Sequence, residues 1–182
     1  MSTVTTKVNG KNKGSSYERK IANLLSARFE KVTGIVSAFR RNADSGSYFG
    51  GSNQRRVVTH DLNHANFGDL ICPDGFKYSV ECKNYKTGPT FAAIVKSKVT
   101  QWDTWIKQAT QDARNSKKEM LLIIKYNGTD DLVFVEQRQP TLKPLFYYNQ
   151  VFGYRLKDFL ARADDEFFPY GLEKYTAHSV LR

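Results

Sequence analysis

Cysteine is scarce in this chain of 182 residues, which contains only Cys72 and Cys82. Two cysteines are too few for a disulfide framework or a thiolate zinc site, so we expect both to be buried, reduced thiols. Long apolar runs are missing too, and the N-terminus has no hydrophobic signal core. We therefore expect no membrane partner and a cytoplasmic location, in the cytoplasm of a host cell if the chain is viral.

Several common catalytic signatures are absent as well. The sequence contains no G-x-x-x-x-G-K-[S/T] loop, no G-x-G-x-x-G turn, no G-x-S-x-G elbow and no C-x-x-C pair. His60 and His64 have a spacing that could bind zinc on a helix, but no third ligand is evident and their segment is typical of a loop. The chemistry of the chain must therefore be sought in other residues.

Acidic residues are scarce in the first third of the chain, which leaves that part strongly basic. Residues 1–60 hold 11 lysines and arginines against three acids, a net charge of +8, and the rest of the chain contributes +2. A one-sided basic excess attracts a polyanion such as nucleic acid by releasing its counterions. A merely solubilising surface is the alternative explanation.

Hydrophobic residues make up 40% of the chain, enough for the core of one domain. Their spacing predicts a helix that begins at Ser15, with Ser15 and Glu18 as a capping box, and then a short strand over 35–40. Residues 42–56 are rich in Gly, Ser and Asn, which predicts a long loop that extends to residue 66.

The later segments predict a sheet. Four strands are expected over residues 67–72, 76–83, 120–126 and 132–136. A helix over 91–113, with a break near 99–100, separates the second strand from the third. Beyond residue 140 an aromatic-rich tail predicts an edge strand and a short helix near 156–163. This order of elements predicts an α/β sandwich around a mixed sheet. The expected parts are a flexible basic N-terminus (1–14), a core (15–140) and an extension packed on the core (141–182).

Three charged residues, Asp69, Glu81 and Lys83, lie around the predicted hairpin. With a three-residue loop Asp69 faces Ser79 and the three charged side chains line one side of the hairpin. A five-residue loop gives the same parity, whereas a four-residue loop puts Asp69 on the other face. Two carboxylates can hold a hard cation such as Mg²⁺, with Mn²⁺ as a substitute, and the lysine can position water or neutralise phosphate charge. An ordinary exposed Glu–Lys pair is the alternative, but a charged pair in an inner strand favours a working site.

The stretch G-D-L-I-C-P-D-G-F-K-Y-S-V-E-C-K at residues 68–83 resembles the signature of the PD-(D/E)-x-K nuclease superfamily. Over residues 13–136 the order of segments is most similar to archaeal and viral Holliday-junction resolvases. It runs from K-G-S-S-Y-E-R-K, with Glu18, through F-R-R and a loop with Ser45 to D-L-I and E-C-K. The chain departs from that pattern in having Gly68 where proline often precedes the first acid, and in a longer segment after Ser45. The resemblance implies a restriction-endonuclease-like fold, a mixed central sheet flanked by helices.

The resemblance further implies a metal-dependent DNA endonuclease that prefers branched DNA. Its implied catalytic residues are Glu18, Ser45, Asp69, Glu81 and Lys83, and its implied metal ligands are Asp69, Glu81, the backbone carbonyl of Cys82, and Glu18. The basic residues expected to contact DNA phosphates are Lys11, Lys13, Arg19, Arg40, Arg41, Arg55 and Arg56. Cutting a junction at symmetric positions needs two active sites, so a homodimer is implied.

Two alternatives stay open on the sequence alone. One is a restriction-like or low-selectivity nuclease acting on duplex or single-stranded DNA, and the other is a non-catalytic basic DNA-binding module. On the helix over 91–113 we expect Gln101 and Gln108 to face solvent. We expect Trp102 and Trp105 to pack in a core or interface rather than to stack on bases.

Overall fold

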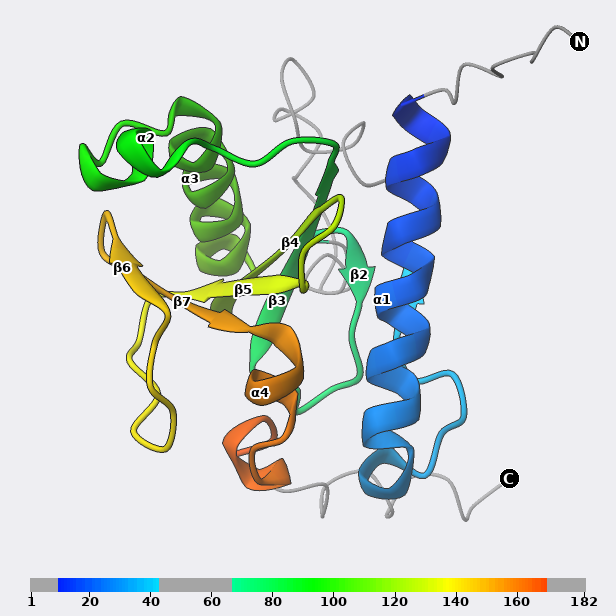
Figure 1. Cartoon of the computed structure of the whole chain (residues 1–182). Helices are drawn as coiled ribbons and strands as arrows, with labels where there is room; N and C mark the ends of the chain where they lie inside the picture. The colour runs from blue at the N-terminus through cyan, green and yellow to red at the C-terminus, as the bar shows by residue number, and fades with distance from the viewer. Residues whose placement is uncertain (1–9, 43–66, 170–182) are drawn as a thin grey trace, which may run out of the picture.

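Helices cover both faces of a mixed β-sheet in the computed structural model, which describes residues 10–42 and 67–169 (Figure 1). The sheet has five strands in the order β3-β4-β5-β7-β6. Their bounds are Tyr78–Tyr85 (β3), Glu119–Tyr126 (β4), Leu132–Val135 (β5), Phe146–Tyr148 (β6) and Val151–Arg155 (β7). Strands β3 and β4 are parallel, and the other neighbours are antiparallel. The predicted α/β fold with a mixed central sheet flanked by helices is confirmed.

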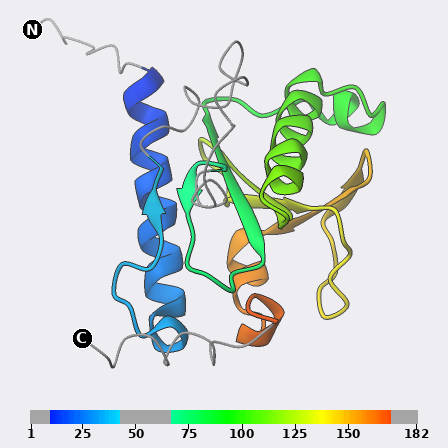
Figure 2. The same cartoon turned by 180° about the vertical axis from the view of Figure 1, so that it is seen from behind.

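The sheet lies between two helices and packs a separate core against each. Helix α1, Gly10–Thr33, covers one face and helix α3, Thr100–Asn115, covers the other, as the views from front and back show (Figure 1, Figure 2). Strand β4 contributes to both cores, because alternate side chains of a strand point to opposite faces. Leu121 lies in the core on the α1 side, and Leu122 lies in the core on the α3 side.

Helix α1 buries most of the apolar stripe that predicted it, but Leu24 of that stripe is 41% exposed. The buried part consists of residues no more than 4% exposed, namely Tyr17, Ile21, Leu25 and Phe29. The helix begins at Gly10, however, so the predicted start at Ser15 and the capping box with Glu18 are wrong, because both residues lie inside the helix. The additional N-terminal residues are tied to the sheet by Lys13, whose Nζ donates to Oδ1 of Asn127 at 3.5 Å.

The predicted strand over 35–40 is also wrong. Only β1, Arg40–Arg41, forms there, and it pairs antiparallel with β2, Leu70–Ile71, in a small second sheet. Ile35 and Val36, whose β-branched side chains suggested a longer strand, are 54% and 73% exposed. β-Branched residues favour a strand only where a partner and a packing surface exist.

The later elements follow the prediction closely. The helix predicted over 91–113 is divided into α2, Phe91–Val95, and α3, which begins at Thr100, so the break near 99–100 is confirmed. The strands predicted over 120–126 and 132–136 are β4 and β5.

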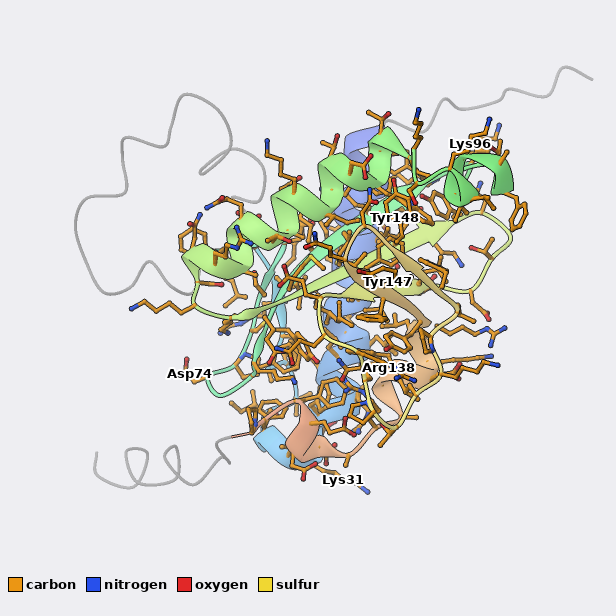
Figure 3. All side chains as sticks on the ribbon, turned by 90° about the vertical axis from the view of Figure 1, so that its left-hand side faces the viewer. Lys31, Asp74, Lys96, Arg138, Tyr147 and Tyr148 are labelled. Carbon is orange, nitrogen blue, oxygen red and sulfur yellow. The ribbon has the colours of Figure 1, made fainter. Side chains whose placement is uncertain are left out.

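The segment beyond residue 140 completes the main sheet. It supplies the edge strand β6, its neighbour β7 and the short helix α4, Leu156–Leu160, followed by the 3-10 turn η3, Asp164–Glu166. Tyr148 ties β6 to the junction of α2 and α3, because its hydroxyl accepts a hydrogen bond from the backbone N–H of Val99 at 2.8 Å (Figure 3). The division of the chain at residue 140 stays a prediction.

Burial tests the expectations about cysteine and tryptophan. Cys82 is a buried free thiol, as expected, but Cys72 is only half-buried, so the expectation that both are buried is wrong for Cys72. Trp102 and Trp105 are 1% and 6% exposed and pack in the core on the α3 side, as predicted. Within the described residues, no helix has both the length and the apolar character needed to cross a membrane.

Candidate active site

Strand β3 divides its side chains between a core and a polar site. Val80 and Cys82 pack in the core on the α1 side. Glu81 and Lys83 therefore point to the opposite face, toward α3, as the alternation in the sequence predicted. Glu81 is only 2% exposed, and the Nζ of Lys83 lies 2.6 Å from its Oε1. The alternative, in which Glu81 and Lys83 form an ordinary exposed ion pair, is therefore excluded, because the Glu81 carboxylate is buried.

Asp69 reaches the same site from the free edge of β3. Its backbone N–H donates to the carbonyl of Val80, and its Oδ2 accepts from the backbone N–H of Cys82, both at 2.8 Å. The predicted pairing of Asp69 with Ser79 in a regular hairpin is thus wrong, since β2 pairs with β1, and Asp69 binds Val80 and Cys82 of β3. The three charged residues nevertheless converge, because the carboxylate bends onto the edge of the strand.

Two neighbouring residues hold Asp69 in this position. Gly68 has a φ of +80°, and a Cβ there would lie 2.6 Å from the carbonyl oxygen of Val80. Asn42 is buried and binds this segment twice: its backbone N–H donates to the Asp69 carbonyl at 2.8 Å, and its Nδ2 donates to the Gly68 carbonyl at 3.1 Å. The sequence places glycine where a proline is usual, and the structure requires glycine at that point.

Gln108 of α3 is exposed, as predicted, but its side chain also reaches the site. Its Nε2 donates to Oε1 of Glu81 at 2.7 Å, and its Oε1 accepts from Nζ of Lys83 at 3.2 Å. The sequence signal that could have identified it is its position beside the buried stripe that contains Trp105 and Ala109. Gln108 thus contacts both Glu81 and Lys83.

Burial and the nearby charge of Asp69 dominate the electrostatics of Glu81. Burial, and then repulsion from Asp69, raise the pKa of Glu81 to about 8, although Lys83 opposes the rise. Burial alone would lower the pKa of Lys83, but the Glu81 carboxylate beside it and Asp69 outweigh burial, so the net shift is upward. Burial also raises the pKa of the Cys82 thiol, with further contributions from Asp69, Glu81 and Glu18. The site is therefore rich in negative charge that a cation would relieve.

Glu18 lies close to the site but has a different partner. Its Oε2 accepts a hydrogen bond from Nε of Arg41 at 2.5 Å. Its charge acts on the Cys82 thiol, which lies on the α1 side of β3. The structure thus brings Asp69, Glu81 and Lys83 together directly and leaves Glu18 paired with Arg41.

The donor set fits a hard divalent cation. Asp69 and Glu81 offer two carboxylates that are 8% and 2% exposed. In a strand the N–H and C=O of one residue point the same way, so the carbonyl of Cys82 faces the edge where Asp69 binds its N–H. Among residues 10–42 and 67–169, no group of three or more His, Cys, Asp or Glu side chains is arranged to hold a metal ion. A small set of one or two carboxylates completed by waters is what Mg²⁺ commonly uses.

The structure gives less information on the other residues predicted to act in catalysis or to bind DNA. Ser45, Arg55 and Arg56 lie outside the described residues, as do His60 and His64. Lys11 lies in α1, but its side chain is outside the described set. Arg19 and Arg40 are exposed, and Arg41 is half-buried in its ion pair with Glu18. Contacts of these basic residues with DNA stay predictions.

The comparison with known proteins bears on this geometry directly. Residues 9–160 match the family described as "Phage putative PDDEXK endonuclease". The chain belongs to this family. The predicted membership of the PD-(D/E)-x-K superfamily and the restriction-endonuclease-like fold are thereby confirmed, and the chain is an endonuclease of the PDDEXK class. Such nucleases act on DNA and generally use divalent metal ions.

Other comparisons add one solved structure. The Holliday junction resolvase Hjc from Archaeoglobus fulgidus is similar over 86% of this chain and 91% of its own, with 17% identity and a TM-score of 0.37. No curated protein matches the chain.

Proposed function

We propose that this PDDEXK endonuclease is Mg²⁺-dependent and cuts branched DNA, four-way junctions above all, with Asp69, Glu81 and Lys83 as its catalytic centre. The observation that carries the proposal is the convergence of two buried carboxylates and one ammonium group on β3. The Nζ of Lys83 lies 2.6 Å from Oε1 of Glu81, and Oδ2 of Asp69 accepts a hydrogen bond from the backbone N–H of Cys82 at 2.8 Å.

The proposed metal ligands are the carboxylates of Asp69 and Glu81 and the backbone carbonyl of Cys82. A bound Mg²⁺ would lower the pKa of water and neutralise charge on the phosphate oxygens. Lys83 orients the attacking water or stabilises the charge that develops on the phosphate, and Gln108 holds the lysine in place. Glu18 would join the metal site by exchanging its contact with Arg41, which is then available to a DNA phosphate.

Branched DNA is proposed because the segment order from Glu18 through Arg41 to Asp69 and Lys83 resembles that of junction resolvases. The basic N-terminal third supplies the charge that a junction, with four duplex arms, requires. A homodimer is part of this proposal, since symmetric cuts need two active sites. A cytoplasmic place of action is proposed with it.

The test is cleavage of a four-way junction, a linear duplex and a single strand of matched sequence in Mg²⁺. The proposal expects junction cutting well above the other two, and equal cutting of all three would contradict the junction preference. Asp69→Asn should abolish cutting, whereas the matched control Asp74→Asn, at the exposed tip of the β2–β3 turn (Figure 3), should not. Binding without cutting in both Mg²⁺ and Mn²⁺ would instead favour a non-catalytic DNA-binding module.

A further inference from the structure

Tyr85 extends the catalytic face of β3 by one more side chain. It is the last residue of the strand, and the alternation that aims Glu81 and Lys83 toward α3 aims Tyr85 the same way. Its ring meets that of Trp105 in α3, with centroids 4.7 Å apart and planes tilted by 45°. The aromatic pair therefore lies on the same side of the sheet as the charged centre.

The two rings differ sharply in exposure. Tyr85 is 43% exposed, whereas Trp105 is 6% exposed. Trp105 is fixed in the core on the α3 side, so it supports the tyrosine ring from within the protein. A ring that is held on one side and open on the other presents a flat apolar surface to solvent at little cost in side-chain entropy.

Tyr85 is also close to the reacting groups. At a rise of about 3.3 Å per residue, two residues along the strand put its Cα about 6.6 Å beyond that of Lys83. The exposed Lys86 follows directly in the chain. A DNA strand with a phosphate at Lys83 would therefore bring a neighbouring nucleotide to Tyr85.

We propose that Tyr85, supported by Trp105, is a stacking platform for an unpaired nucleobase next to the phosphate that is cut. The inference rests on the proposed function and narrows its substrate to DNA with an unstacked base at the cut site. Aromatic side chains stack on every base because each base has a π-face, so the platform needs no sequence preference. Bases inside a regular duplex already stack on each other, whereas a branch point exposes bases that can leave the stack at low cost. The platform thus favours branched DNA over a continuous, regular duplex.

The test compares two variants of Tyr85 with the wild type on two substrates. Tyr85→Leu and Tyr85→Phe are assayed for kcat/KM on a branched substrate that carries either a normal nucleotide or an abasic one beside the cut phosphate, on each side in turn. Tyr85→Leu should lose roughly tenfold on the normal substrate, in line with the loss of one base–aromatic stack, and Tyr85→Phe should keep its rate. On the abasic substrate, wild type and Tyr85→Leu should cut equally. Equal loss on both substrates would overturn the proposal, because a purely structural role of Tyr85 predicts that outcome.

A matched control is available on the opposite edge of the sheet. Tyr147 on β6 is 61% exposed and is backed by Phe152 at 4.9 Å between centroids, so it offers a similar exposed ring away from β3 (Figure 3). Tyr147→Leu should leave kcat/KM unchanged on both substrates. If it lowers the rate as Tyr85→Leu does, the effect is not specific to the catalytic face and the proposal fails.

A second readout separates this inference from the proposed catalysis. DNA with 2-aminopurine at the same nucleotide is bound in metal-free buffer, where no cutting is needed. Wild type and Tyr85→Phe should quench its fluorescence by stacking, and Tyr85→Leu should not. Quenching by a wild-type protein that never cuts would preserve the platform and reject the catalytic proposal. The same fluorescence with Tyr85→Leu as with wild type would reject the platform.

Discussion

The Oδ2 of Asp69 accepts a hydrogen bond from the backbone N–H of Cys82, 2.8 Å away, at the free edge of β3. The carboxylate thereby takes the place that the carbonyl of a neighbouring strand would occupy. This contact fixes the first acid of the site relative to the second, because Glu81 precedes Cys82 on the same strand. It depends on a backbone conformation of Gly68 that only glycine adopts easily.

Gly68→Ala should therefore damage both the fold and the site. The φ of +80° alone costs a non-glycine residue about 1–2 kcal/mol, and the new Cβ would press on the Val80 carbonyl. We expect the free energy of unfolding to fall by about 2 kcal/mol or more in urea titrations, with a loss of DNA cleavage. Gly128→Ala is the control, because Gly128 has a φ of +74° but nothing within 4 Å of its Cβ position. Equal destabilisation by both changes, with normal cleavage by Gly68→Ala, would contradict this account.

Gln108→Ala should lower kcat without unfolding the protein. The side chain binds both Glu81 and Lys83, so its loss frees the lysine from the position proposed for catalysis. We expect a fall in single-turnover rate of roughly tenfold and an unchanged melting temperature. Gln111→Ala is the matched control on the same helix, since the Gln111 side chain binds the exposed Asn115 rather than Glu81 or Lys83. A Gln108→Ala enzyme as fast as wild type would show that the contact has no part in catalysis.

Metal binding should release protons, and the reason lies in Glu81. Burial and Asp69 raise its pKa from 4.5 to about 8, so between these values the folded protein holds a proton that the unfolded chain has lost. The metal-free protein should therefore lose stability as pH rises from 4.5 to about 8, and Mg²⁺ should bind more tightly over the same range.

Calorimetry in two buffers of different protonation enthalpy measures this proton release, and unfolding in EDTA as a function of pH measures the stability. Glu81→Gln should remove both dependences, because the amide does not titrate. Mg²⁺ affinity that stays constant with pH in the wild type would contradict the assignment of Glu81 as a ligand.

The sequence predicted those parts of the molecule that depend on local periodicity. The alternation in residues 76–83 correctly predicted that the side chains of Glu81 and Lys83 point away from the core that contains Cys82. The apolar spacing of α1 and α3, and the break before Thr100, also follow from residues close together in the chain.

The errors and omissions arise where distant segments meet. A regular hairpin was the simplest way to bring Asp69 to β3, but β2 pairs with β1 instead. Asn42 binds Gly68 across 26 residues of sequence, and Gln108 binds Glu81 across 27. The periodicity of α3 places Gln108 beside the buried stripe of the helix, but it does not name the partner of either residue, and only the folded structure identifies these partners.

The most direct test of the central claim is the single-turnover rate of junction cleavage by Lys83→Ala in saturating Mg²⁺. Lys77→Ala is its control, because the Lys77 side chain pairs with Glu119 at the start of the sheet rather than with Asp69, Glu81 or Lys83. Loss of a group that stabilises the reacting phosphate predicts a fall of about a hundredfold or more for Lys83→Ala, with DNA binding retained and Lys77→Ala near the wild-type rate. Cleavage by Lys83→Ala at the wild-type rate would contradict the claim that Asp69, Glu81 and Lys83 form the catalytic centre.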